Sequence, residues 1–311
     1  METYALGMIE AALELGHQPV VFCQTADYSI PFAEKCEIHE YGKKNIPNKI
    51  QTLLFHSWLK KESLKSNLDL SIGCCFGGQP DVIVCGGDRK GYLLAMNKPL
   101  LLWNRLFIKL EKEIFSNSKL IISHSKLVAQ ELVNLYSIEK ERIHVIYPPQ
   151  KFSKKSISVD KIALREKYKI PNDKRVFLFA SMSHKRKGFD LLREHFQNSS
   201  SDNLLLVAGK PVKHEYKNIF SLGFCSEMDD LYQLSDYTIL ASQYEPFGLV
   251  GIESVLNGTP VIMSDNIGCC EVISPVALKT FQRSRPETLD KVIDDLKDNP
   301  IQLSQPYEQY I

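Results

Sequence analysis

The chain has 311 residues, of which 44% are hydrophobic and 24% are charged, and its formal net charge is +1. This length suits two domains of ordinary size, and the composition is that of a soluble globular protein. The small net charge argues against bulk nucleic-acid binding through a basic face, although local basic patches remain open.

The N-terminal residues "METYALGMIE" are acidic and lack the basic segment of a signal peptide, and no apolar run approaches ~18 residues, so we expect no membrane span. Most of the eight cysteines lie in apolar runs such as "SIGCCF" and "DVIVCGG". There is no C-x-x-C pair and no cluster with zinc spacing. We therefore expect buried, reduced thiols in a cytoplasmic protein without a metal site.

The first half of the chain predicts alternating helices and strands. Helical spacing of apolar residues predicts a helix that Gly16 ends, and Pro19 then begins a strand. Further apolar runs predict strands at 68–76, 81–87, 98–103, 119–123 and 143–147, with helical patterns such as 126–136 between them. Continuous apolar strands between helices are typical of a parallel sheet covered on both faces.

The stretch "PPQKFSKKSISVD" at 148–160 has the composition of a linker. It divides the chain into an N-terminal Rossmann-like domain, 1–150, and a C-terminal one, 151–311. The second half predicts strands at 175–181, 203–209, 236–242 and 259–264, and helices at roughly 188–197, 227–235, 248–257 and 286–297. We expect an α/β fold of two Rossmann-like domains facing across a cleft, with ligands at the carboxyl ends of the strands.

The stretch "YEPFGLVGIE" (244–253) places two carboxylates around a turn. Glu245 follows the strand at 236–242, and a helix begins near Leu249. A helix N-terminus suits phosphate, and carboxylates accept hydrogen bonds from hydroxyl groups. Glu245 and Glu253 could therefore hold the sugar and the ribose of a nucleoside diphosphate sugar. The alternative is an acidic pair on a solvated helix face.

A second candidate stretch is "SHKRKGFDLL" (183–192), in which a basic loop precedes Gly188 and an amphipathic helix. The loop contains His184, Lys185, Arg186 and Lys187. Cations here would stabilise the charge that develops on a pyrophosphate leaving group without a metal. The alternative is a solvated basic loop, and Arg186 and Lys187 are the stronger candidates.

The segment "EPFGLVGIE" resembles the Glu-x7-Glu motif of retaining glycosyltransferases of the GT-B fold, family four (group 1). Residues 221–273 look like that family almost throughout. "RIHVIYPP" is similar to its domain junction and "KRKGFDLL" to its Lys-Gly loop, so the resemblance covers essentially the whole chain.

The resemblance implies a role for each matching residue. Glu245 would contact donor-sugar hydroxyls, Glu253 would hold the ribose, and Arg186 and Lys187 would neutralise the pyrophosphate. The backbone amides of Phe247, Gly248, Leu249 and Val250 would cradle the sugar and phosphates. The family needs neither a metal nor a cofactor for its chemistry, and its retention by front-face attack requires no protein nucleophile.

The Arg-Lys-Gly order and the "PP" of the junction are particularly similar to lipopolysaccharide core heptose glucosyltransferases, which use UDP-glucose. In those enzymes an acidic residue of the first domain lies near the acceptor, and "CGGDRKG" offers Asp88, for which a simple loop cap is an equal alternative. The basic and aromatic segment 88–115 would touch the cytoplasmic face of the inner membrane. The alternative for 88–115 is an ordinary amphipathic helix on the sheet.

One feature departs from the family, which opens with a strand and a glycine-rich loop before its first helix. This chain starts at "METYALGMIEAALELGH", the matching helix, so either its start is placed too late or the chain is truncated. If it is truncated, we expect a sheet that lacks this strand and exposes apolar edges. Two other functions remain open. They are a non-catalytic remnant that binds nucleotide sugar, and a sugar-nucleotide epimerase of the same fold, which would need its own acid-base residues.

Overall fold

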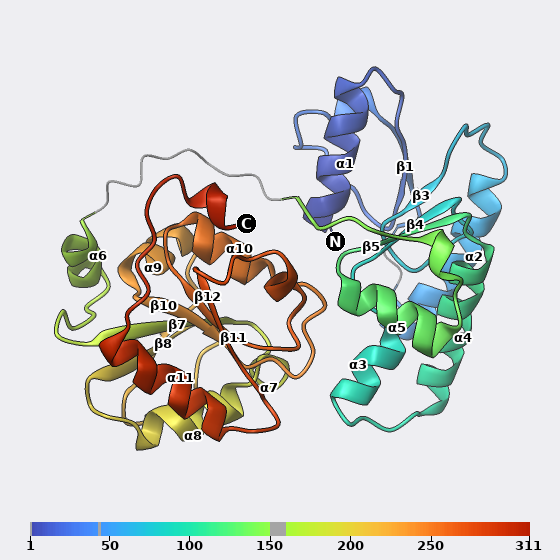
Figure 1. The fold of residues 1–311 in the computed structure, drawn as a ribbon. Coiled ribbons are helices and arrows are strands. Elements are labelled where there is room, and N and C mark those ends of the chain that lie inside the picture. The colour runs from blue at the N-terminus through green and yellow to red at the C-terminus, as the bar shows by residue number, and fades with distance from the viewer. Residues whose placement is uncertain (1, 43–44, 150–159) are drawn as a thin grey trace. The chain divides into compact units, whose positions relative to one another are not determined.

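The computed structural model describes residues 2–42, 45–149 and 160–311 (Figure 1). The chain divides into two units: unit 1 comprises Met1–Leu93 and Pro99–Pro149, and unit 2 comprises Leu94–Lys98 and Gln150–Ile311. The expected linker at 148–160 lies almost wholly outside the described residues.

The first 149 residues form two parallel sheets. The helices are α1 (Glu2–Glu14), η1 (Ala33–Lys35), α2 (Asn48–Ser63), α3 (Arg89–Ala95), α4 (Leu102–Asn117), α5 (Lys126–Tyr136) and η2 (Lys140–Arg142). The strands are β1 (Val20–Cys23), β2 (Glu37–Glu40), β3 (Ile72–Gly73), β4 (Val82–Cys85), β5 (Leu120–Ser123) and β6 (Ile143–Val145). β1 pairs with β2, and the other sheet has the order β3-β4-β5-β6. No strand of the described residues joins the two sheets.

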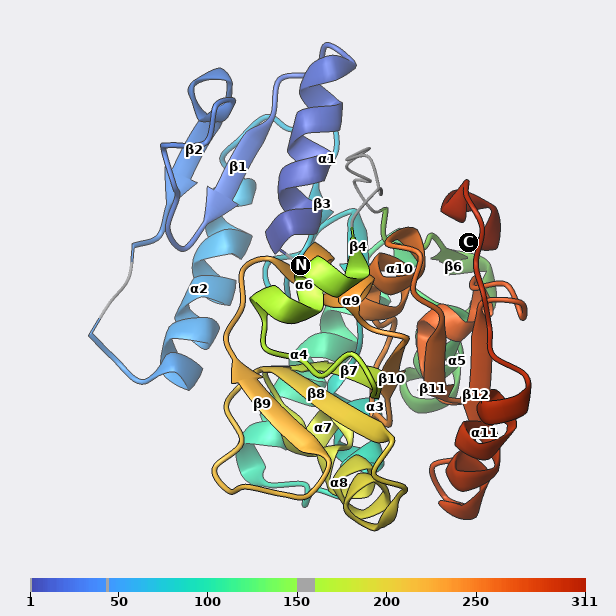
Figure 2. The same cartoon turned by 90° about the vertical axis from the view of Figure 1, so that its left-hand side faces the viewer.

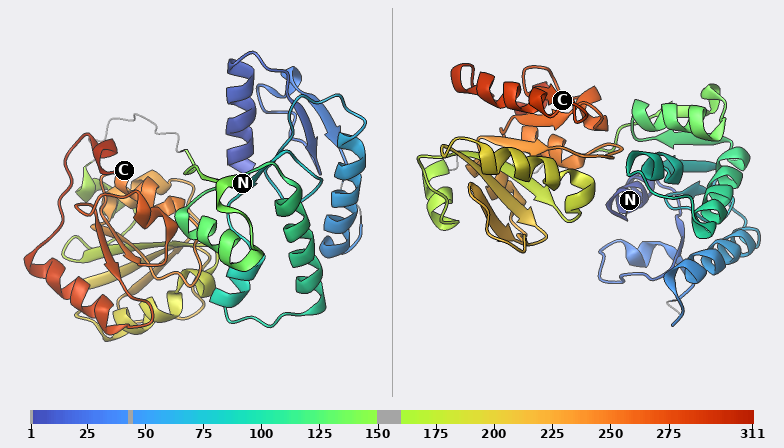
Figure 3. Two further views of the ribbon diagram at one scale, coloured as in Figure 1. Left: turned by 45° about the vertical axis from the view of Figure 1, so that its right-hand side comes forward. Right: turned by 90° about the horizontal axis from the view of Figure 1, so that it is seen from below.

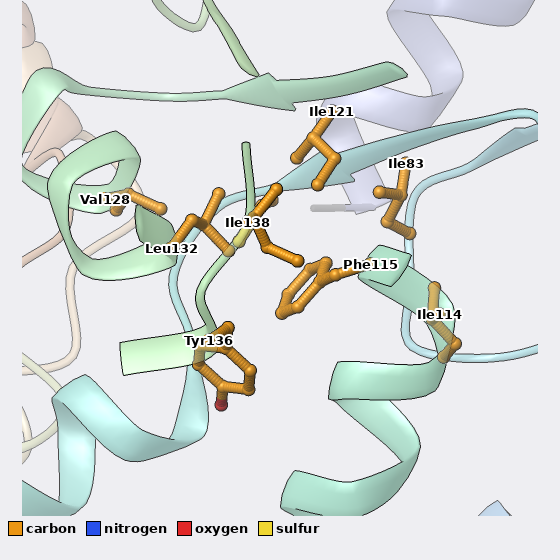
Figure 4. Packing of buried hydrophobic residues seen from close by; sticks show 9 residues of the cluster. Ile83, Ile114, Phe115, Ile121, Val128, Leu132, Tyr136 and Ile138 are labelled. Atoms are coloured by element: carbon orange, nitrogen blue, oxygen red, sulfur yellow. The ribbon is translucent and has the colours of Figure 1, made fainter. Parts of the chain in front are cut away.

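The core of unit 1 lies between its four-stranded sheet and helices α4 and α5. Ile83 of β4 and Ile121 of β5 are fully buried, and the rings of Phe115 and Tyr136 meet edge to face at 5.1 Å (Figure 4). The two rings come from α4 and α5, so this contact joins the two helices.

Helix α2 lies beside the β1–β2 pair (Figures 2 and 3). Aromatic side chains make the contact between them. Trp58 lies 6.2 Å from the ring of Phe22 and 5.5 Å from that of Tyr41. These contacts give the two-stranded sheet one covered face, which a two-stranded ribbon needs for stability.

Unit 2 contains one parallel sheet of six strands in the order β12-β11-β10-β7-β8-β9. The strands are β7 (Arg175–Ser181), β8 (Asn203–Gly209), β9 (Ile219–Gly223), β10 (Tyr237–Leu240), β11 (Val261–Ser264) and β12 (Leu278–Phe281). The helices are α6 (Lys161–Lys167), α7 (His184–Lys187), α8 (Phe189–Asn198), α9 (Met228–Leu234), α10 (Leu249–Leu256), η3 (Gly268–Glu271), α11 (Glu287–Asp298) and η4 (Tyr307–Tyr310). Helices α9 and α10 lie on one face of the sheet, and α8 and α11 on the other (Figures 1 and 2). Both faces are therefore covered, which explains the continuous apolar strands.

The structure confirms the α/β class with parallel sheets, and β7 and β8 have the bounds that the sequence predicts. The strand predicted at 98–103 is wrong. Leu100 and Leu101 are more than half exposed, and α4 begins at Leu102, so this apolar run enters a helix rather than a sheet. The short strands β2, β9 and β12 were not predicted.

The prediction of buried cysteines is correct for only part of the set. All eight thiols are free, but only Cys85 and Cys269 are buried, and Cys75 is exposed. The apolar run "SIGCCF" forms only the two-residue strand β3, so its cysteines are not enclosed by a sheet.

Candidate active site

Two loops that follow neighbouring strands build the candidate site in unit 2. β7 and β10 are paired in parallel, so their carboxyl ends lie at the same edge of the sheet. The backbone N–H of Gln243, after β10, donates to the carbonyl oxygen of Arg186, after β7, at 2.8 Å. The sheet therefore brings together the two stretches that the sequence analysis singled out separately.

An ion pair joins the two loops. Arg186 Nη1 lies 2.8 Å from Glu245 Oε2 and also donates to the carbonyl oxygen of Tyr244 at 3.0 Å. The side chains are 27% exposed for Arg186 and 13% for Glu245. Partial burial strengthens such a charge-assisted bond, so the guanidinium is held in place rather than solvated. A freely solvated basic loop is therefore excluded for Arg186.

Lys187 points back to the strand that precedes it. Its Nζ donates to the carbonyl oxygen of Ala180 at 3.0 Å. Burial lowers the pKa of Lys187, and the charge of Glu245 opposes that shift. The ammonium thus lies at the carboxyl end of β7, close to the Arg186–Glu245 pair.

Two glycines permit these loops to approach the sheet. Gly188 has φ +83°, and a Cβ there would lie 1.8 Å from the carbonyl oxygen of Ala241. Gly248 has φ +93°, and a Cβ there would lie 2.9 Å from Ile267 Cγ2. Any side chain would be strained at both positions, and at Gly188 it would overlap the backbone.

The turn at 245–248 directs the N-terminus of α10 to the same edge of the sheet. No side chain caps this helix, whose N-cap residue is Gly248. Phe247 is buried and Leu249 is 39% exposed. A helix N-terminus has backbone N–H groups without partners inside the helix and a partial positive charge, which together favour an anionic ligand.

Glu253 lies one helical turn further along α10. Its Oε2 accepts a hydrogen bond from the hydroxyl of Tyr232 at 2.7 Å. Burial raises the pKa of Tyr232 well above its usual value, so this hydroxyl is a stable donor. The sequence analysis missed Tyr232, because nothing in "DDLYQL" indicates which helix will pack beside it.

Asp88 lies in unit 1, after β4, and is 4% exposed. Its Oδ1 accepts a hydrogen bond from the N–H of Gly91 at 2.8 Å, which caps the start of α3. The structure thus shows the capping role that the sequence left open. A catalytic role for Asp88 stays a prediction.

The segment 88–115 divides into an inward-facing and an exposed part. Phe107 is buried, and the Arg89 guanidinium lies over its ring at 4.7 Å. Exposed fractions are 51% for Leu100, 60% for Leu101, 81% for Leu102 and 40% for Trp103. We call Leu100–Trp103 the leucine patch. The amphipathic-helix alternative therefore fits the later part of α4, whereas the leucine patch is an apolar surface.

No group of three or more His, Cys, Asp or Glu side chains in the described ranges is placed to hold a metal ion. None of the helices found there has both the length and the apolar character needed to cross a bilayer.

Two Rossmann-like units built on parallel sheets have the architecture of the GT-B fold. Residues 1–149 match the profile "Glycosyltransferase Family 4", and residues 160–310 match "Glycosyl transferases group 1". A probable transglycosylase of Burkholderia thailandensis is 32% identical over 297 residues, which are 95% of this chain and 82% of that protein. The chain belongs to the group 1 glycosyltransferases.

Solved structures agree with this fold. WaaG, a glycosyltransferase involved in lipopolysaccharide biosynthesis, superposes with a TM-score of 0.76 at 19% identity, over 94% of this chain and 86% of its own. Anabaena HepE, in complex with UDP and glucose, superposes with a TM-score of 0.66 at 14% identity, over 98% of this chain and 90% of its own. At these identities the likeness establishes the fold alone.

Proposed function

We propose that this glycosyltransferase moves a hexose from a UDP-glucose type of donor to a glycan or lipid-linked acceptor, with retention and without a metal. The observation that carries the proposal is the Arg186–Glu245 ion pair, which lies at the carboxyl ends of β7 and β10 beside the N-terminus of α10. The complex of HepE with UDP and glucose supports a uridine nucleotide as the donor class.

The proposed roles follow from what each group can offer. Only Nη1 of Arg186 has partners among the described residues, so its other N–H donors can reach phosphate oxygens. Lys187 adds a second positive charge. The backbone amides of Phe247–Val250 add the partial positive charges of their N–H groups. Glu245 accepts hydrogen bonds from the sugar hydroxyls. Glu253, held by Tyr232, accepts them from the ribose.

The transfer step needs no protein nucleophile. The acceptor hydroxyl oxygen bonds to the anomeric carbon on the face from which the diphosphate departs. The bond between that carbon and the phosphate oxygen breaks, its electron pair stays on the phosphate, and the acceptor's proton passes to that phosphate oxygen. Arg186 and Lys187 stabilise the negative charge while it develops, which is where catalytic electrostatics acts most strongly.

We also propose that the acceptor is membrane-borne, of the lipopolysaccharide core type, and that the protein works at the cytoplasmic face of the inner membrane. The leucine patch supports this proposal, because exposed leucines beside Arg105 and Lys109 suit an interface with anionic headgroups. Binding to phosphatidylglycerol vesicles should fall with Leu102→Ser. It should persist with Leu64→Ser, the matched control, because both leucines are 81% exposed. Equal binding by the two variants would contradict membrane contact through this patch.

Donor turnover tests the central proposal. The purified chain is offered UDP-glucose, UDP-galactose, UDP-N-acetylglucosamine and GDP-mannose, with and without a chelator. One donor should be consumed, both with and without the chelator. NMR of the product should show that the transferred sugar keeps the α configuration that it has in the donor. Glu245→Gln should lower turnover about 10²–10³-fold, as for loss of one transition-state contact. Glu287→Gln, an exposed acid of unit 2, should not.

The same experiment separates the alternatives. A donor that binds without turnover, even with lipid acceptors present, would support the non-catalytic remnant. Formation of an epimerised sugar nucleotide would support the epimerase. Unchanged turnover in Glu245→Gln would contradict the proposed site.

A further inference from the structure

The loop that leads from β10 to Glu245 is held by side chains of other loops. β10 ends at Leu240, so the next four carbonyl groups lie beyond the last residue of the strand. Each of them accepts a hydrogen bond from a side chain. The hydrogen-bond donors are Arg283 for Ala241, Asn266 for Ser242 and Gln243, and Arg186 for Tyr244. The path of this loop, and with it the place of Glu245, therefore depends on these side chains.

Arg283 connects three loops at the carboxyl edge of the sheet in unit 2. It follows β12, which ends at Phe281. β7, β10, β11 and β12 run parallel in one sheet, so this loop emerges at the same edge as the candidate site. Arg283 Nη2 lies 3.2 Å from both carboxylate oxygens of Asp190, in the first turn of α8. One guanidinium thus joins the loop after β10 to the helix that follows Gly188.

The same guanidinium lies against Gly188. A Cβ at Gly188 would lie 2.6 Å from Arg283 Nη1 and 1.8 Å from the carbonyl oxygen of Ala241. The three residues therefore meet at one point. Arg186 and Lys187 directly precede this glycine, so a displacement of Gly188 would move both cations with it.

An ordinary surface ion pair does not explain this arrangement. The side chains are 18% exposed for Arg283 and 58% for Asp190, and an ion pair with one partner so exposed contributes little to stability. Ala241, in contrast, is fully buried. A buried carbonyl that loses its hydrogen-bond donor is costly, so we expect the loop to rearrange without the guanidinium. The planar guanidinium directs two nitrogens to two partners, which the single ammonium of a lysine cannot match.

We propose that Arg283 is a positioning residue for the transfer reaction, which fixes the loops after β7 and β10 so that their charged side chains face the sugar donor together. It acts through Gly188 and Ala241 and does not itself touch the sugar donor. What these loops bind rests on the proposed function, whereas the hold of Arg283 on them rests on the contacts within unit 2 alone.

Amide hydrogen exchange tests the hold of Arg283 on the loop without any substrate. In Arg283→Ala, residues 241–251 should exchange about tenfold faster than in the wild type, because the N–H of Gln243 is bonded across the two loops and opens with them. Strand β8 should keep its wild-type exchange, which shows that the sheet is folded. Arg285→Ala is the matched control, because Arg285 lies two positions further along the same loop with a side chain that is 60% exposed. It should exchange like the wild type.

Kinetics with the nucleotide sugar that turns over test the effect on catalysis. Arg283→Ala should lower kcat about 10–10²-fold, as for a small displacement of catalytic groups. The KM for the nucleotide sugar should change less than about threefold, because the displaced charges act mainly on the transition state. The stoichiometry of UDP binding in calorimetry should equal that of the wild type, which excludes a loss of folded protein. Arg285→Ala should keep the wild-type kcat.

Chemical rescue separates positioning from a general defect. Methylguanidinium can enter the space that Arg283→Ala leaves, because the parent side chain is partly exposed. At about 20 mM it fills about two thirds of the sites if its Kd is near 10 mM. It should raise the kcat of Arg283→Ala several-fold and leave that of Arg285→Ala unchanged. Arg283→Lys, which keeps the charge without the fork, should have a kcat between those of the wild type and Arg283→Ala.

A second variant keeps the proposal falsifiable if Arg283→Ala proves unstable. Asp190→Asn removes the carboxylate that orients the guanidinium, so it should show the same changes to a smaller degree. Unchanged exchange at 241–251 in these variants, or faster exchange with the wild-type kcat, overturns the proposal. So does a loss of kcat that lowered UDP stoichiometry explains and methylguanidinium does not restore. A wild-type chain that neither binds UDP nor consumes a nucleotide sugar would overturn the proposed function instead, and the exchange would still decide whether Arg283 holds the loop.

Discussion

Glu111→Gln is expected to change how the stability of unit 1 depends on pH. Burial raises the pKa of Glu111 from 4.5 to about 7, against the opposing effects of the Tyr136 hydrogen bond and the Arg89 charge. Between these two values the native state holds a proton that the unfolded state has released. The free energy of unfolding therefore falls as pH rises from about 4.5 to about 7, and the loss is complete above the native pKa.

The magnitude follows from the width of that interval. At about 1.4 kcal/mol per pH unit, the step from 4.5 to about 7 corresponds to about 3 kcal/mol. The side chain is 3% exposed, so solvent screening reduces this figure little. Glutamine keeps the shape and cannot ionise, so the variant should lack this loss.

Unit 1 can be followed separately, because Trp58 and Trp103 are the two tryptophans of the chain and both lie in it. Urea unfolding monitored by their fluorescence, at about pH 5 to about pH 8, gives the free energy of unfolding at each pH. The wild type should lose about 2–3 kcal/mol more than Glu111→Gln over this range. Glu113→Gln, whose parent side chain is 39% exposed, should parallel the wild type. Parallel curves for the wild type and Glu111→Gln would refute the reasoning.

Three further predictions concern unit 2. Gly188→Ala should destabilise it by more than the ~1–3 kcal/mol of a left-handed alanine, because the new Cβ would overlap a backbone carbonyl. Gly223→Ala is the control, because Gly223 has φ +80° and nothing lies within 4 Å of the added Cβ, so only the conformational cost should appear. Urea unfolding followed by circular dichroism measures both variants. Equal losses of unfolding free energy in the two variants would contradict the overlap. Tyr232→Phe removes the hydrogen bond to Glu253 and should weaken UDP binding by about 1 kcal/mol, or about fivefold, with little change in kcat; an unchanged Kd in calorimetry would argue against ribose binding by Glu253. Removal of divalent metal with a chelator should leave donor turnover unchanged, and restoration of lost turnover by Mg²⁺ alone would disprove metal independence.

Several features of the fold could be predicted because they depend on the residue types within a short stretch of sequence. The strands at 175–181 and 203–209 are apolar without interruption and are buried on both faces of the sheet, so length and composition identify them. The run at 98–103 has a similar composition but is largely exposed, and only its surroundings distinguish it from a strand. Short edge strands such as β2, with the sequence "EIHE", have no such pattern.

The sequence by itself determined the parallel α/β class, the family resemblance and the candidate loops around Arg186 and Glu245, because these depend on residue type and short-range spacing. Only the tertiary structure decided that these two side chains, 59 positions apart, form one ion pair. It also decided that Glu111 is buried against Tyr136, 25 positions away. Charge pairing and desolvation depend on distance in space, and the sheet that sets those distances is assembled from strands remote in sequence.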